Sequence, residues 1–205
     1  MSVKDLLNQL DVSRETQDRL EVFEQVIRKW NPRINLVSRA SLDDLWIRHI
    51  IDSIQVYRSA QSANRWLDIG SGGGFPGVIV GIMAASENPA MTTTLIESDQ
   101  RKSAFLRTAA RECSAKIEVI SERIEKVEPH KADVLSARAL ADLSTLLRFA
   151  DQHLDIDGVA LFPKGVTWKK ELEAARQHWC FEAEPITSLT EPDAVILKVK
   201  GVTLA

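Results

Sequence analysis

The sequence has few cysteines, no long apolar run and little net charge. Cys113 and Cys180 are its only cysteines, so neither a disulfide framework nor a cysteine-rich metal site is predicted, and both are expected to be buried thiols. No apolar run approaches the roughly 20 residues of a membrane-spanning helix. The charged start, MSVKDLLNQLDVSRE, is unlike a secretory signal. We therefore expect a protein of the reducing cytoplasm with no membrane partner and no metal ion.

The net charge of −3 and the pI of about 5.9 argue mildly against a broad nucleic-acid surface. The charge is nevertheless uneven. Residues 28–58 carry six Lys and Arg against three Asp and Glu, and residues 99–123 carry six against four. Each stretch is compatible with a local basic face and with an ordinary solvated surface.

The first sixty or so residues predict helices and no strand. Ser13 is expected to cap a helix whose apolar residues recur at three- and four-residue steps over Leu20–Trp30, and Pro32 is expected to stop it. Ser41 opens a capping-box pattern for a second helix that runs to Tyr57. We therefore assign residues 1–62 to an N-terminal helical extension.

Residues 63–205 alternate between expected strands and helices, which predicts an α/β domain with a mostly parallel sheet and helices on both faces. The last two strands are expected to form an antiparallel hairpin. The expected strands are 66–69, 92–97, 116–120, 132–136, 158–162, 181–186 and 194–199. The expected helices begin at residue 76 and span 99–113, 140–153 and 168–179. Ligands of such sheets bind beyond the carboxyl ends of the strands.

The stretch WLDIGSGGGFPG contains a glycine pattern in two registers. GxGxxG over 72–77 would indicate a dinucleotide and an NAD-dependent oxidoreductase, but the strand ends near Ile69, so this pattern starts late, and Pro76 lies where helix is expected. GxGxG over 70–74 starts directly after the strand. Its glycines let a bulky ligand approach the backbone, so we favour this register and expect Gly70 and Gly72 to contact a ligand.

Polar residues follow the neighbouring strands. Glu97 ends the next strand, where a carboxylate can accept hydrogen bonds from both ribose hydroxyls of an adenosine ligand. Ile124 is placed to cover an adenine face while Glu125 reads its edge, although Glu125 is equally compatible with a surface acid. Arg138 follows a further strand and adds another polar side chain at the same edge of the sheet.

Five segments together resemble a known family. LDIGSGGGFPG, LIESDQRKSAFLR, ERIEK and SARAL, with the earlier WNPRINLVSR, are similar to bacterial small-subunit ribosomal RNA guanine-N(7) methyltransferases of the glucose-inhibited division protein B family. RHIIDSI and FPKG fit the same family. The resemblance extends from about Leu20 to Lys200 and implies a Rossmann-like methyltransferase fold with a seven-stranded sheet.

The resemblance implies S-adenosylmethionine as cofactor and methyl transfer to N(7) of a guanine in small-subunit (16S) ribosomal RNA, either naked or in an assembled subunit. A small-molecule methyltransferase of the same fold remains the alternative within this class. By position, the resemblance and the glycine loop predict these cofactor contacts: Gly70, Gly72, Phe75, Glu97, Ile124, Glu125 and Arg138.

Guanine N(7) carries a free lone pair and no proton, so the reaction needs positioning and no general base. Methylation of a cytosine carbon would need a cysteine nucleophile, and neither cysteine follows a strand in the required place. SARAL stands where amine methyltransferases usually carry Asn/Asp-Pro-Pro-aromatic. Lys164 and Arg138 are expected to position the reactants. The expected substrate contacts are Asn35, Arg39, Arg48, His49 and Lys164, with Asp52 as a further candidate or as a partner that orients Arg48 or His49.

Overall fold

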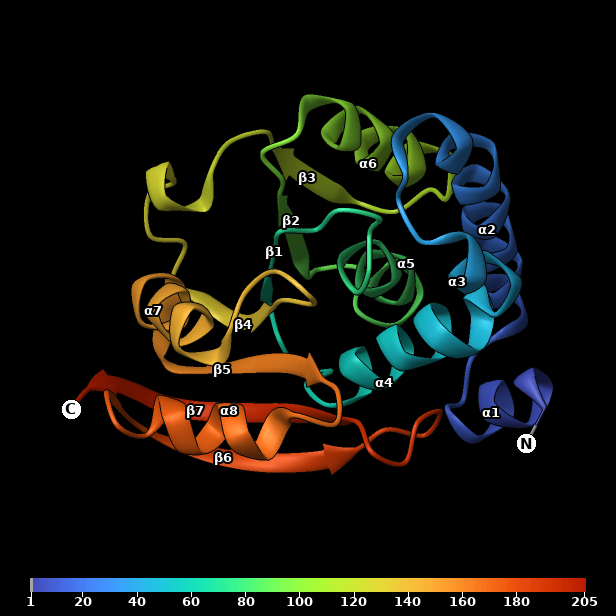
Figure 1. Cartoon of the computed structure of the whole chain (residues 1–205). Helices are drawn as coiled ribbons and strands as arrows, with labels where there is room; N and C mark the ends of the chain where they lie inside the picture. The colour runs from blue at the N-terminus through green and yellow to red at the C-terminus, as the bar shows by residue number, and fades with distance from the viewer. Residues whose placement is uncertain (1) are drawn as a thin grey trace.

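A computed structural model, which describes residues 2–205, contains one seven-stranded sheet (Figure 1). The strand order is β3-β2-β1-β4-β5-β7-β6. The strands are β1 (Arg65–Ile69), β2 (Thr92–Ile96), β3 (Ile117–Ile120), β4 (Ala132–Ser136), β5 (Leu154–Lys164), β6 (Trp179–Thr187) and β7 (Val195–Leu204). The first five run parallel, and β7 runs antiparallel to both β5 and β6. The predicted fold class is confirmed.

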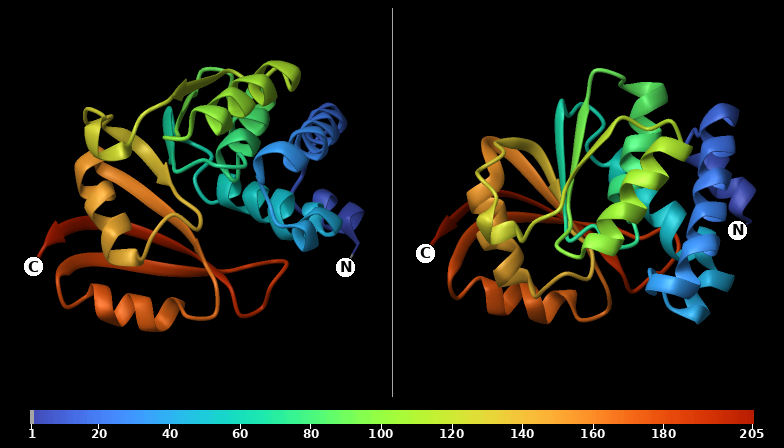
Figure 2. Two further views of the ribbon diagram at one scale, coloured as in Figure 1. Left: turned by 45° about the horizontal axis from the view of Figure 1, so that its top comes forward. Right: turned by 90° about the horizontal axis from the view of Figure 1, so that it is seen from above.

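Helices cover both faces of the sheet (Figure 1, Figure 2). One face carries the helices before β1 together with α5 and α6, and the other carries α7 and α8. Trp66 and Leu67, successive residues of β1, point into the two opposite cores, as alternation along a strand requires. The helices are α1 (Val3–Gln9), α2 (Arg14–Ile34), α3 (Arg39–Asp43), α4 (Asp52–Arg58), α5 (Gly77–Glu87), α6 (Gln100–Glu112), α7 (Leu143–His153) and α8 (Trp168–Ala175).

The helices before residue 62 are not packed separately. Phe23 of α2 and Ile54 of α4 belong to the same apolar core as Ile79 of α5 and Phe105 of α6. The domain boundary at residue 62 therefore stays a prediction. It marks the point where the sequence pattern changes from helices alone to alternating strands and helices, and the packing shows no break there. Within residues 2–205 no helix is both long and apolar enough to cross a bilayer.

Pro32 does not end α2, contrary to expectation. The helix continues to Ile34 and ends at Asn35, whose φ of 48° is left-handed. Pro32 cannot donate a helical bond itself, but bonding continues beyond it, because the Asn35 amide donates to the Asn31 carbonyl at 3.0 Å. Asparagine tolerates the left-handed conformation that commonly closes a helix.

The second N-terminal helix is also different from the prediction. Its cap is Ser38, whose hydroxyl accepts a hydrogen bond from the Ser41 amide at 3.1 Å. The expected continuous helix is divided into α3, a π-helical turn η1 (Trp46–Ile51) and α4. Such wide turns are frequent at functional sites, and this one carries two of the predicted site residues.

Three smaller expectations are wrong near the C-terminal half. α7 begins at Leu143, because Asp142 caps it through the Thr145 amide, and not at residue 140. α8 ends at Ala175, four residues early. Cys113 is buried as expected, but Cys180 is exposed, because it alternates with the buried Trp179 on the edge strand β6.

Candidate active site

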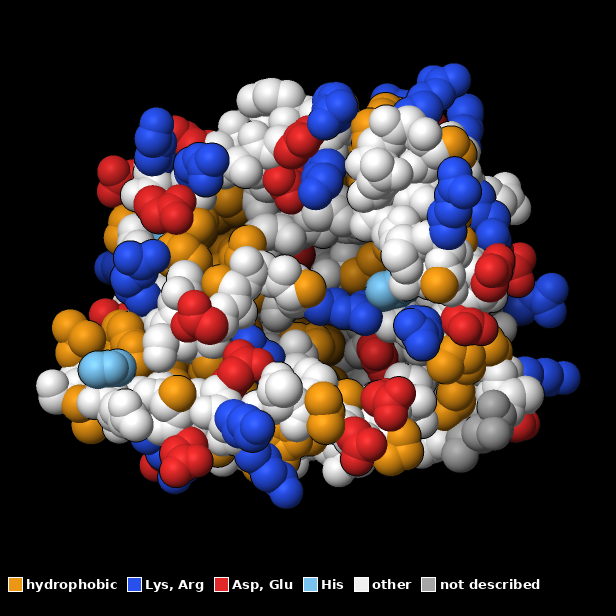
Figure 3. Space-filling model, in the orientation of Figure 1, with side chains coloured by type: hydrophobic (Ala, Val, Ile, Leu, Met, Phe, Trp, Pro, Cys, Tyr) orange, Lys and Arg blue, Asp and Glu red, His pale blue; other side chains and the backbone are white. Residues whose placement is uncertain are grey.

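Two adjoining cavities open at the carboxyl ends of the parallel strands (Figure 3). The smaller cavity, of about 360 Å³, is lined by Gly70, Gly72, Glu97, Ile124 and Glu125. The larger cavity, of about 1050 Å³, is lined by Arg48, His49, Asp52, Arg138 and Lys164. Both cavities share residues 139–141, which follow β4. Most of the predicted site residues are thus brought to one edge of the sheet.

The glycine loop has the register favoured from the sequence. Gly70 and Gly72 have φ values of 63° and 49°, which favour glycine, and both line the smaller cavity. Gly77 has a different reason to be glycine. A Cβ there would lie 2.6 Å from Oδ2 of the buried Asp68, so a side chain would collide with this carboxyl.

Glu97 connects the glycine loop to the next strand end. Its Oε2 accepts a hydrogen bond from the Gly72 amide at 2.8 Å, and its Oε1 accepts one from the Asp99 amide at 2.8 Å. The residue is only 7% exposed, so these bonds hold the carboxylate firmly at the cavity wall. Each carboxylate oxygen can accept a second bond, which leaves both available to a pair of hydroxyls.

The other predicted cofactor contacts divide into two groups. Ile124 and Glu125 start the 3₁₀ turn η2 (Ile124–Lys126) and line the smaller cavity, with Ile124 buried and Glu125 exposed. Phe75 lines neither cavity. Its ring stacks on His49 with centroids 4.9 Å apart and packs against Phe23 in the core. A cofactor contact by Phe75 stays a prediction, and its observed contact supports His49.

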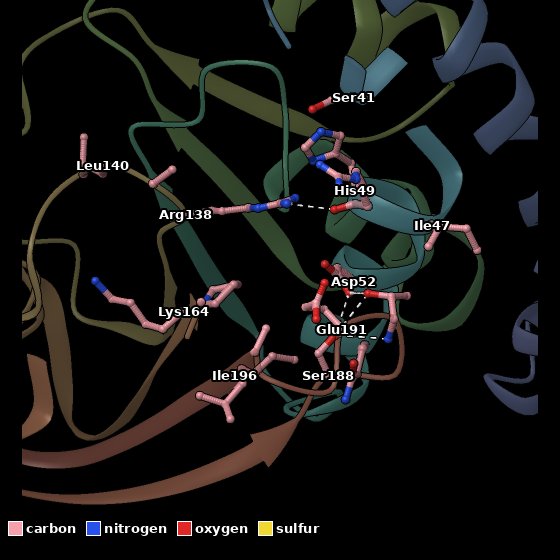
Figure 4. A pocket seen from close by; sticks show the side chains of 18 of the residues that line it. Ser41, Ile47, His49, Asp52, Arg138, Leu140, Lys164, Ser188, Glu191 and Ile196 are labelled. Atoms are coloured by element: carbon pink, nitrogen blue, oxygen red, sulfur yellow. Dashed lines mark hydrogen bonds between the residues drawn. The ribbon is translucent and has the colours of Figure 1, made fainter. Parts of the chain in front are cut away.

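Arg138 reaches across the larger cavity (Figure 4). Its Nη2 donates to the Arg48 carbonyl at 2.8 Å, while its buried Nη1 has no partner within residues 2–205. Burial lowers the pKa of the guanidinium, although the nearby Asp52 opposes this. A buried donor without an acceptor is costly, so Nη1 is a natural site for an anionic or carbonyl group of a ligand.

His49 is a second unpaired group in the same wall. Both of its ring nitrogens are buried and lack a partner among the described residues. Burial, followed by the charges of Arg138 and Arg48, lowers the pKa of His49 to about 4. The imidazole is therefore neutral at pH 7 and offers one donor and one acceptor to a ligand.

Lys164 ties the loop after β4 to α8. Its Nζ donates to the Ala141 carbonyl at 3.2 Å and to Glu171 Oε2 at 2.7 Å. The same loop carries Leu140, whose Cδ1 would lie 2.5 Å from a Cβ on Gly70. Lys164 thus anchors the segment that lines both cavities.

Asn35 and Arg39 are exposed and line neither cavity. Their segment nevertheless runs along the glycine loop, because a Cβ on Gly73 would lie 3.0 Å from the Leu36 carbonyl oxygen. Contact of either residue with a substrate stays a prediction. Nothing in the geometry places them beside the reacting groups.

Two features of the site were not expected from the sequence. Asp52 does not pair with Arg48 or His49. Its Oδ1 accepts hydrogen bonds from Ser188 and Thr190 in the turn between β6 and β7. Asp68 accepts from the Ser136 hydroxyl at 2.6 Å, and burial raises its pKa to about 6. Only its position two residues before Gly70 could have drawn attention to Asp68, and the serine and threonine of ITSLTEPD carry no recognisable signal.

This chain is similar to known proteins over almost its whole length. The GidB family model, described as rRNA small subunit methyltransferase G, matches residues 16–195. The ribosomal RNA small subunit methyltransferase G of Ruegeria pomeroyi is 62% identical over 96% of both chains. That of Cereibacter sphaeroides is 52% identical over 98% of both.

Solved structures support the fold alone. The S-adenosylhomocysteine-bound methyltransferase PaMTH1 of Podospora anserina has a TM-score of 0.63 at 13% identity, over 92% of this chain and 88% of its own. The ribosomal protein L11 methylase of Lactobacillus delbrueckii has a TM-score of 0.57 at 16% identity, over 78% of each chain. With a family model that spans most of the sequence and relatives of such high identity, the chain belongs to the GidB family of rRNA small subunit methyltransferases G.

Proposed function

We propose that this chain transfers the methyl group of S-adenosylmethionine to N(7) of a guanine in small-subunit (16S) ribosomal RNA. Family membership confirms the methyltransferase class and the methyl donor expected from the sequence, and it decides against the NAD-dependent and small-molecule alternatives. The assignment of residues to each ligand is our proposal, as are the assembled small subunit as a form of the substrate and a cytoplasmic location.

The observation that carries the proposal is the pairing of the two cavities. The smaller one has the features that an adenosine needs, with the anchored Glu97 for the ribose hydroxyls and the apolar Ile124 for the adenine. Arg138 Nη1 offers an unused donor for a carboxylate, which suits the amino-acid end of the cofactor. The residues present therefore fit S-adenosylmethionine, which when bound supplies an activated methyl group.

We assign the larger cavity to the target base, which its residues orient. Guanine N(7) attacks with a lone pair that carries no proton, so the site needs accurate placement more than proton transfer. His49, neutral at pH 7, suits a hydrogen-bonding role and not that of a charged acid. Arg48 and Arg138 supply cations that suit a phosphate-bearing substrate, although acids also line this cavity and Lys164 is paired with Glu171.

The simplest test uses labelled S-adenosylmethionine with unmodified 16S ribosomal RNA and with small subunits that lack the modification. We expect label in at least one of the two, and comparison of their rates identifies the preferred form. Label that enters neither RNA nor subunits would refute the proposed substrate.

The two basic stretches noted in the sequence meet in the structure. α2 and α6 pack together through Trp30 and Phe105, whose ring centroids are 5.9 Å apart. A groove between these helices is lined by Lys29, Arg33 and Arg111. We assign this groove to the ribosomal RNA backbone, because clustered cations beside a half-buried aromatic residue suit phosphate contacts.

Replacing Lys29 and Arg33 together with Gln is expected to weaken RNA binding because two phosphate contacts are lost. The slope of log affinity against log salt should fall by about 2 in magnitude. Affinity for S-adenosylhomocysteine should not change, since both residues lie outside the two cavities. Arg148→Gln, an exposed cation of α7 on the other face, is the matched control. If the double variant binds RNA as this control does, the RNA backbone does not bind in this groove.

Lys164→Ala is expected to reduce RNA methylation about tenfold, the effect of losing hydrogen bonds made by a charged group. Cofactor binding should change much less. Glu171→Gln, which removes the ionic partner but leaves the ammonium, separates loop anchoring from direct contact with RNA. Single-turnover rates and S-adenosylhomocysteine titrations measure both properties. An equal loss of both properties would instead place Lys164 in the cofactor site.

A further inference from the structure

Asp52 is one of the carboxylates that line the larger cavity, and the proposed chemistry gives it no role. Asp52 begins α4 and is half-buried in the cavity wall. Its Oδ1 accepts a hydrogen bond from the Ser188 hydroxyl at 3.1 Å and another from the Thr190 hydroxyl. Two parts of the chain more than a hundred residues apart therefore converge on one oxygen.

The turn that supplies these hydroxyls is itself fixed to α4. The Gln55 side chain donates from Nε2 to the Thr187 carbonyl at 2.7 Å, and its Oε1 accepts a hydrogen bond from the Leu189 backbone amide at 3.0 Å. These bonds lie on both sides of Ser188, so the orientation of the Asp52 carboxylate is determined by the fold. An oriented carboxylate costs little reorganisation when a ligand binds.

The second oxygen of Asp52 is available to a ligand. Oδ2 accepts no hydrogen bond from residues 2–205, and no Lys or Arg of that range forms an ion pair with Asp52. Burial raises the pKa of Asp52, while Thr190, Arg138 and Ser188 oppose the rise. Figure 4 shows Asp52 one helical turn beyond His49, beside the β6–β7 turn.

The other acids around this cavity are less suited to recognise a ligand. Asp44 lies 3.9 Å from Arg48 and both side chains are largely exposed. Glu191 is exposed in the middle of the β6–β7 turn. Glu171 is paired with Lys164, and both carboxylate oxygens of Asp142 accept hydrogen bonds from Thr145 at the start of α7. Asp52 is the acid that combines a fixed orientation with an open oxygen.

We propose that Asp52 selects guanine by accepting a hydrogen bond from the 2-amino group of the target base. The inference rests on the proposed function. Enzymes that act on a base read it through its Watson–Crick edge. Guanine presents neighbouring N1–H and 2-amino donors on that edge, whereas adenine has an acceptor at N1 and no 2-amino group. N(7) lies on the opposite edge, so this contact leaves it free to react.

The same contact stabilises the transition state. The N(7) lone pair forms the bond to the methyl carbon while the carbon–sulfur bond breaks and its electron pair goes to sulfur. No proton moves, and the positive charge passes from the sulfonium to the base. A fixed carboxylate on the base therefore interacts more strongly as the reaction proceeds, which is the condition for catalysis.

The test is a cycle that combines Asp52→Asn with inosine, which lacks the 2-amino group, at the mapped target nucleotide. In the wild type, inosine should lower kcat/KM about tenfold or more, as expected for loss of a hydrogen bond to a charged group. In Asp52→Asn, inosine should cost less than about twofold, because coupled changes are not additive. Glu191→Gln, the matched control, should keep the full inosine penalty. An inosine penalty in Asp52→Asn equal to that of the wild type would overturn the inference.

Affinity for S-adenosylhomocysteine provides a second readout. It should stay within about twofold of wild type in Asp52→Asn, the limit usual for independent sites. A tenfold loss in a folded variant would assign Asp52 to the ammonium of the cofactor and refute guanine selection. If Asp52→Asn does not fold, Thr190→Val replaces it and should shrink the inosine penalty, whereas an unchanged penalty contradicts the inference. Absence of guanine methylation by the wild type would refute the proposed function itself.

Discussion

Glu97→Ala is expected to lower the affinity for S-adenosylhomocysteine about 100-fold. The carboxylate is proposed to accept both ribose hydroxyls, and each such bond to a charged group contributes roughly 1.5 kcal/mol or more. The loss of both hydrogen bonds therefore raises the dissociation constant about 100-fold. Calorimetric titration well below the melting temperature measures the loss directly.

Glu97 also has a structural role that the experiment must separate. The variant leaves the Gly72 and Asp99 amides without their acceptor, so a lower melting temperature is expected as well. Glu97→Gln keeps the side-chain shape and removes the charge, and should lose most of the affinity. Glu122→Ala removes an exposed acid from the same cavity and should have little effect. Similar affinity losses in the Glu122 and Glu97 variants would contradict the ribose assignment.

Gly72→Val is expected to reduce cofactor affinity by at least about 100-fold, because it combines two effects. A left-handed φ of 49° is strained for any residue with a Cβ, at roughly 1–3 kcal/mol. The branched valine side chain would also project from the loop that lines the smaller cavity, where the ligand must approach the backbone. The measurement is again S-adenosylhomocysteine titration, with thermal unfolding recorded in parallel.

Gly72→Ala distinguishes strain from obstruction. A Cβ at this position would be 3.7 Å from the Gly70 carbonyl oxygen, so it fits without collision but keeps the backbone strain. The alanine variant should therefore lose stability like the valine variant but bind the cofactor better. Equal binding by wild type and both variants would show that the cofactor does not approach this part of the loop.

The sequence predicted the sheet and the smaller cavity well, because both depend on local signals. Short apolar runs identify the strands, and the carboxyl ends of neighbouring parallel strands must meet at one edge. Gly70, Glu97 and Ile124 each follow such a strand, so their meeting could be anticipated. The start of the glycine pattern directly after Ile69 also identified its register.

The larger cavity was less predictable, because its geometry depends on contacts between distant segments. The π-helical turn that carries Arg48 and His49 interrupts a pattern typical of one continuous helix. One of the two roles considered for Asp52 was to orient Arg48 or His49, yet its hydrogen-bond partners come from a turn near the C-terminus. The cofactor contact that the resemblance implies for Phe75 stays a prediction, and the stacking of its ring on His49 was not foreseen from the sequence. No spacing rule within one segment encodes these contacts.

The most direct test of the central claim is to map the methyl group on ribosomal RNA after reaction with S-adenosylmethionine. Aniline cleavage after borohydride reduction cuts RNA at 7-methylguanosine, and mass spectrometry of the fragments identifies the nucleotide. We predict one new cleavage site at a guanine of the small-subunit RNA, which disappears with Glu97→Ala at limiting cofactor. Methylation at another atom of the base, at a ribose or on a nucleotide other than guanine would contradict the account.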